Sequence, residues 1–75
     1  MDKLLLLKTF AVVVSEGSFT KAADKLGSSN QLVSKYIAEL EKQLDTRLFN
    51  RTTRKIYLTE AGQQCLQHAN HILES

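Results

Sequence analysis

The sequence predicts a small, mainly α-helical domain with three helices, then a two-stranded β-hairpin, then a long C-terminal helix. Three observations support this fold class. The 75-residue chain has no proline and only three glycines, which favours helices joined by tight turns. Apolar residues recur at helical spacing over most of its length. Between residues 48 and 58 this spacing changes to the short alternation that is typical of strands.

The first expected helix begins near Leu4 and ends at Gly17. Its buried stripe is predicted to contain Leu4, Leu7, Phe10, Ala11 and Val14. Further apolar residues widen the stripe almost all round the helix, namely Leu5, Leu6, Val12 and Val13. Such a helix has either an oversized core stripe or, as we expect, a second apolar surface that another helix or a partner covers.

The next two helices are expected over about residues 19–26 and 30–43. Ser18 is placed to cap the first of them, Gly27 to end it, and Ser29 to cap the second. The inward positions of the second are Val33, Ile37, Leu40 and Leu44. Two helices joined by a short turn, the second polar on its outer face, are typical of a helix-turn-helix, although any three-helix bundle shares this periodicity.

Polar residues at the start of the 30–43 helix suit the edges of DNA bases. The amides of Asn30 and Gln31 can each donate and accept at an adenine edge, and Lys35 can reach guanine O6 or N7. Ser34 lies on the same outer face. Ser29 and the N–H groups of the first turn suit a phosphate oxygen. The pattern therefore predicts a helix that enters the major groove.

Two strand-like runs, residues 48–51 and 55–58, predict a hairpin with a basic tip. Residues 47–59 contain four basic and no acidic residues, namely Arg47, Arg51, Arg54 and Lys55. A basic wing of this kind beside a polar helix favours a winged helix-turn-helix that binds nucleic acid. We expect Arg54 to enter a narrow minor groove, and Arg51 and Lys55 to contact phosphates.

Thr59 is placed to cap the last helix, with Glu60 favourable in its first turn. An apolar stripe follows, and no stop signal ends it, so we expect this helix to continue in a longer parent protein.

The remaining chemistry-bearing residues do not indicate catalysis or a metal site. Cys65, the single cysteine, suits a reducing cytosol. Cys65, His68 and His71 follow one another at intervals of three residues. Positions at this interval drift round a helix, and a zinc site usually needs four protein ligands, or three and a water molecule. Packing in a dimer seam or a redox role for Cys65 remains open. No stretch is apolar enough to span a membrane, and no nucleophile–base–acid order or glycine-rich phosphate loop is present. Tyr36 and Tyr57 are expected to be half-buried.

Many of these residues form an ordered pattern without gaps. The pattern comprises Phe10, residues 16–20, Ala22, Ala23, Leu26, Ser29, Ser34, Ile37, Leu40, Glu41, Leu44, Leu48, Phe49, Arg51, Arg54 and residues 58–62. In essentially all 75 residues the chain resembles the N-terminal DNA-binding domain of LysR-type transcriptional regulators.

The resemblance implies a winged helix-turn-helix domain over residues 1–58 and the start of a linker and dimerisation helix over 59–75. It implies sequence-specific binding of double-stranded promoter DNA as a homodimer in the bacterial cytoplasm, associated with the nucleoid. A tetramer of the full-length protein and a contact with RNA polymerase are further candidates. No cofactor is expected in this domain, and a small-molecule effector would bind a C-terminal domain that is absent here.

The resemblance also implies a role for individual residues. The expected DNA contacts are Ser18, Thr20, Ser29, Asn30, Gln31, Ser34, Lys35, Arg51, Arg54 and Lys55. The expected dimer contacts are Leu4, Leu5, Leu66, Ala69, Ile72 and Leu73, in an interface of about 1,200 Å² or more. Asn30, Gln31 and Lys35 replace the family's usual glutamine, proline and arginine, and lysine lacks the bidentate fork of arginine. The bases that relatives contact therefore cannot be transferred to this chain.

Two further points remain open. Asp45 stands where glycine is common in the family, which leaves the turn after the third helix open. A function of a different class would use the same fold to dock the wing and third helix on an acidic protein partner.

Overall fold

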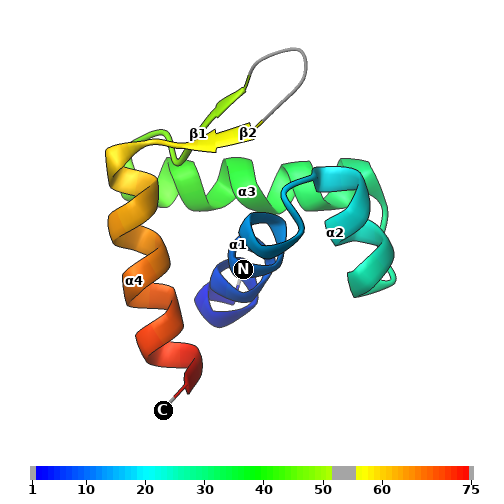
Figure 1. Ribbon diagram of the computed structural model, residues 1–75, viewed down its shortest axis with the longest axis horizontal. Helices are drawn as coiled ribbons and strands as arrows, with labels where there is room; N and C mark the ends of the chain where they lie inside the picture. The colour runs from blue at the N-terminus through cyan, green and yellow to red at the C-terminus, as the bar shows by residue number, and fades with distance from the viewer. Residues whose placement is uncertain (1, 52–55, 75) are drawn as a thin grey trace.

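The computed structural model describes residues 2–51 and 56–74, which form four helices and one two-stranded antiparallel sheet. In chain order these are α1 (Lys3–Glu16), α2 (Phe19–Leu26), α3 (Asn30–Leu44), β1 (Phe49–Arg51), β2 (Ile56–Leu58) and α4 (Glu60–Glu74). Figure 1 shows α3 crossing the molecule, with α2 beside its N-terminal end and α4 near its other end. The predicted order of elements is confirmed.

Local capping explains where the helices begin and end. The hydroxyl oxygens of Ser18, Ser29 and Thr59 each accept a hydrogen bond from the backbone N–H three residues further on, at 3.3, 3.1 and 2.9 Å. Gly17 and Gly27 end α1 and α2 in the left-handed region, with φ of 70° and 66°. These predicted caps and stops are therefore confirmed.

The buried face of α1 differs from the predicted stripe. Leu6 and Val13 are 0% and 1% exposed and belong to the core, whereas Leu4 is 49% exposed. Ala11 and Val14 are only half-buried. The helix is apolar almost all round, so its periodicity did not fix the direction in which it packs; α1 contacts α2, α3 and α4 together.

On α3 the core positions Val33, Ile37 and Leu40 are at most 1% exposed, as predicted. Leu44, also predicted to face inward, is 39% exposed because it is the last residue of the helix.

Tilted and edge-to-face contacts between aromatic rings attach the hairpin to the helices. The ring of Phe49 on β1 lies 5.3 Å from that of Phe10 on α1 and 5.8 Å from that of Phe19 on α2, measured between centroids. The strands pair in the register Phe49 with Leu58, Asn50 with Tyr57 and Arg51 with Ile56. Phe49 is 3% exposed while Tyr57 is 52% exposed, so the hairpin has one buried and one exposed face. The half-buried position predicted for Tyr57 is therefore wrong; Tyr36 is half-buried as expected.

The first turn of α4 lies against the hairpin. The Thr59 hydroxyl donates to the Arg47 carbonyl oxygen (2.6 Å), and the Thr59 N–H donates to the Leu48 carbonyl oxygen (3.0 Å). Further along α4, Ala69 is fully buried in the core. No helix within the described residues is long and apolar enough to cross a membrane.

Candidate nucleic-acid interface

The turn between α2 and α3 brings the two helices close together. Ala22 and Ala23 are 0% and 3% exposed where α2 packs in the core, and small side chains allow a near approach. After Gly27, the Ser28 N–H donates a hydrogen bond to the Ala23 carbonyl oxygen (2.8 Å). The chain thus reverses within three residues, and Ser29 caps the N-terminus of α3. This is the geometry of a helix-turn-helix.

The outer face of α3 is polar where the sequence predicted it. Asn30, Gln31 and Lys35 are exposed, and Ser34 is half-buried. Leu32, which the prediction did not single out, is 37% exposed in the same stretch. With Val33 and Ile37 on the buried side, α3 presents amide and ammonium groups to solvent over its first two turns.

Two of the predicted contact residues bond to each other. Asn30 Nδ2 donates to Thr20 Oγ1 across 3.1 Å, and both side chains are exposed. Ser18 and Ser29 instead use their hydroxyl oxygens as helix caps. Both hydroxyls keep a proton that an anion can accept.

Hydrogen bonds from two sides fix the base of the wing. Glu41 Oε2 on α3 accepts from the backbone N–H of Leu48 (2.8 Å), and Thr59 holds the Arg47 carbonyl oxygen. The sequence analysis did not predict this bond, since a side chain that accepts from the backbone of a later loop leaves no periodic signal in the sequence. Of the predicted wing contacts, Arg51 is in β1. Its side chain, and the whole of Arg54 and Lys55, belong to the part of the chain that the structure does not describe.

The residues predicted for dimerisation differ in exposure. Leu4, Leu5 and Leu73 are 49%, 41% and 39% exposed, whereas Leu66 and Ile72 are half-buried against the chain's own core. Ala69 is 0% exposed and offers no surface to a partner, because α4 turns this position toward the core of its own chain.

Cys65 lies half-buried on α4. Burial raises the pKa of the Cys65 thiol, and the nearby positive charge of Lys3 partly opposes this rise in pKa. Within the described residues, no three His, Cys, Asp or Glu side chains are placed to hold a metal ion.

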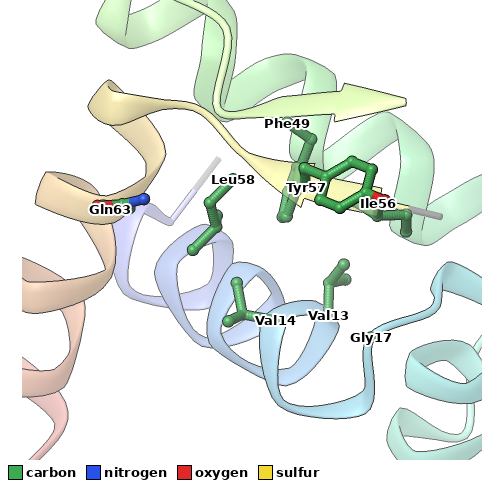
Figure 2. A pocket seen from close by; sticks show the side chains of 8 residues that line it. All are labelled: Val13, Val14, Gly17, Phe49, Ile56, Tyr57, Leu58 and Gln63. Atoms are coloured by element: carbon green, nitrogen blue, oxygen red, sulfur yellow. The ribbon is translucent and has the colours of Figure 1, made fainter. Parts of the chain in front are cut away.

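A groove of about 340 Å³ lies between α1 and the hairpin. Figure 2 shows Val13 and Val14 of α1 on one side of it and the strand residues Phe49, Ile56 and Leu58 on the other. Gln63 of α4 and Tyr57 are its polar lining residues. The other lining residues are apolar side chains and Gly17.

Comparison with known proteins gives consistent matches over this fold. The family model described as "Bacterial regulatory helix-turn-helix protein, lysR family" matches residues 4–63. An HTH-type transcriptional repressor of Pseudomonas aeruginosa is 46% identical over 74 residues, which are 99% of this chain and 23% of that protein. The HTH-type transcriptional regulator CrgA of Neisseria meningitidis is 44% identical over 68 residues, 91% of this chain and 23% of the relative. The chain thus spans about a quarter of these relatives.

Solved structures agree in three dimensions. The BenM DNA-binding domain in a complex with catB site 1 DNA superposes with a TM-score of 0.92 at 38% identity, covering 97% of this chain and 82% of that one. The CbnR domain in a DNA complex also has a TM-score of 0.92, at 34% identity, covering 97% of this chain and 84% of that one. The predicted winged helix-turn-helix fold is therefore confirmed.

Proposed function

The chain belongs to the LysR family of bacterial regulatory helix-turn-helix proteins, and we propose that it binds promoter DNA as the DNA-binding domain of a transcriptional regulator. The observation that best supports this function is the polar outer face of α3, exposed beside the wing on a fold that matches DNA-bound relatives. In this proposal α3 enters the major groove, and Gln31, Ser34 and Lys35 approach the bases. Ser18, Thr20 and Ser29 contact phosphates.

The wing completes the proposed contact with DNA. Arg54 enters the minor groove and Arg51 and Lys55 bind phosphates, since a narrow minor groove has enhanced negative potential. The described hydrogen bonds at Leu48 and Thr59 support this role because they fix the strands from which the wing extends.

The proposal for the whole protein goes further. The relatives are about four times as long as this chain, so we propose that an effector domain follows the linker helix and binds a small molecule. The protein acts as a homodimer, or a tetramer when full-length, in the bacterial cytoplasm at the nucleoid. RNA polymerase is a candidate partner, and the domain has no catalytic role.

A salt titration tests DNA binding against the rival function of docking on an acidic protein. The affinity of the chain for duplex DNA should fall steeply with added salt, with a slope of about −0.9 in log K against log salt for each phosphate neutralised. No duplex binding at low salt, or a flat salt dependence, would contradict the proposal.

Two substitutions separate contacts with bases from contacts with the minor groove. Gln31→Ala should relax the preference at one base pair by about 1–3 kcal/mol, whereas Arg54→Ala should weaken binding most at sites with A·T-rich flanks. Binding-site selection from a random duplex library measures both. Equal losses on all sequences would contradict these roles.

A further inference from the structure

The hydrogen bond between Asn30 and Thr20 links the two helices of the helix-turn-helix at their N-terminal ends. Asn30 is the first residue of α3, and Thr20 is the second residue of α2. Nδ2 of Asn30 donates to Oγ1 of Thr20 over 3.1 Å, between residues ten positions apart. Both side chains are exposed, so the bond lies on the surface and not in the core.

The two atoms in contact, Nδ2 of Asn30 and Oγ1 of Thr20, define the direction of this bond. An amide nitrogen donates only, so the Thr20 oxygen is the acceptor and the Thr20 hydroxyl proton is left to another acceptor. Phosphate oxygens only accept. A hydroxyl held in this way therefore has the polarity that a DNA backbone requires.

We propose that Asn30 is a positioning residue that acts through Thr20, holding the Thr20 hydroxyl so that its proton is presented to a backbone phosphate. The inference rests on the proposed function and assigns Asn30 a different role from the base contact expected from sequence. Asn30 then contributes to affinity on every DNA sequence, while base preference comes from Gln31, Ser34 and Lys35.

A double-mutant cycle in the 75-residue chain tests this relay, in which Asn30 acts on DNA only through the Thr20 hydroxyl. Binding of Thr20→Val, Asn30→Ala and the double variant is measured on a duplex that the wild-type chain selects from a random library, and on a scrambled duplex of equal length. Each single variant should lose about fivefold in affinity on both duplexes. The double variant should bind no more weakly than Thr20→Val, because Asn30 acts only through that hydroxyl.

Salt dependence adds a readout that loss of structure would not give. The Thr20 hydroxyl carries no charge, so the slope of log K against log salt should be the same in the variants and the wild type. Losses that add in the double variant would overturn the relay. So would an Asn30→Ala loss confined to one base pair of the selected duplex, because Asn30 would then contact a base directly.

Two further variants test the direction of the bond. Thr20→Ser keeps the hydroxyl and should bind like the wild type. Asn30→Asp should lose more affinity than Asn30→Ala, because a carboxylate accepts the Thr20 proton and repels phosphate. Asn30→Asp binding as well as the wild type would overturn the proposal.

Folding and the parent proposal are controlled separately. Thermal unfolding checks that each variant is folded. If Asn30→Ala is not folded, the DNA affinities of Thr20→Val, Thr20→Ser and Asn30→Asp still test whether Asn30 acts through the Thr20 hydroxyl. Wild-type chain that binds no duplex would contradict the proposed function itself. Intact wild-type binding with an unchanged Asn30→Ala affinity would overturn only the relay.

Discussion

At the scale of single residues, Gly62 occupies a position where no side chain fits. A Cβ there would overlap the Leu48 carbonyl oxygen and lie 2.9 Å from Leu58 Cδ2. Because a backbone carbonyl cannot rotate away as a flexible side chain can, Gly62→Ala should lower the free energy of unfolding by about 1–3 kcal/mol, despite the higher helix propensity of alanine. Thermal denaturation measures this loss. Gln64→Ala, at an exposed position in the same helix, is the control and should be neutral.

Asp45 is the one residue other than glycine with a positive φ, 53°, within the described part of the chain. Its N–H donates to the Lys42 carbonyl oxygen and that of Thr46 to the Glu41 carbonyl oxygen, which ends α3 in a Schellman motif. Glycine adopts this conformation without strain, so Asp45→Gly should keep or raise stability, by up to about 1 kcal/mol. Asp45→Ala should lower it. Chemical denaturation of both variants tests the pair, and a more stable alanine variant would contradict the assignment.

Residues at the helix ends show which local features can be predicted from a sequence. Caps and stops at Ser18, Ser29 and Gly27 were predictable because each acts within a few residues of itself. The bonds of Asn30 to Thr20 and of Glu41 to Leu48 were not, since each depends on how a turn brings separate segments together.

At the scale of elements, α3 and α1 differ in how well their buried faces could be predicted from the sequence. The sequence of α3 has distinct polar and apolar faces, so the side that packs in the core was predicted correctly. The exposure of Asn30, Gln31 and Lys35 follows from that orientation. On α1 the apolar residues surround the helix, so the choice of Leu6 and Val13 for the core depended on the other three helices.

The contact between α1 and α4 has a testable electrostatic consequence. Burial raises the Cys65 pKa and Lys3 opposes the rise, so Lys3→Ala should raise that pKa further and slow alkylation of Cys65 by iodoacetamide at pH 8. Lys8→Ala, the other lysine of α1, is the control. Equal alkylation rates in the two variants would contradict this effect of Lys3.

The same shift makes a prediction about alkaline stability. The folded pKa of Cys65 lies above the unfolded one, so its contribution to stability is complete at neutral pH and lost as pH rises through the folded pKa. Cys65→Ala should therefore show a smaller loss of melting temperature between pH 7 and alkaline pH than the wild type. An identical loss in both would contradict it.

At the scale of the whole molecule, exposed leucines occur at the start of α1 and the end of α4. Both ends lie away from the hairpin (Figure 1), and the two helices contact each other. We therefore expect two copies of the chain to pair on the side away from the hairpin. Leu4 and Leu73 therefore form the centre of the proposed dimer surface, with Leu66 and Ile72 contributing only their exposed edges. Leu5 instead lines a groove with Leu26 and Leu32, on the side of α1 that faces α2 and α3.

Leu73→Glu tests this dimer. Burial of one leucine contributes about 1.5–3 kcal/mol, so the charge should weaken dimerisation at least about tenfold and lower the affinity for a two-half-site duplex. Leu44→Glu is a matched control, because Leu44 on α3 is equally exposed at 39% and lies outside the proposed surface. Sedimentation equilibrium measures both dissociation constants. If Leu73→Glu dimerises like the wild type, or if Leu44→Glu weakens the dimer as much, the copies meet through another face and the leucines at the ends of α1 and α4 are exposed for a different reason.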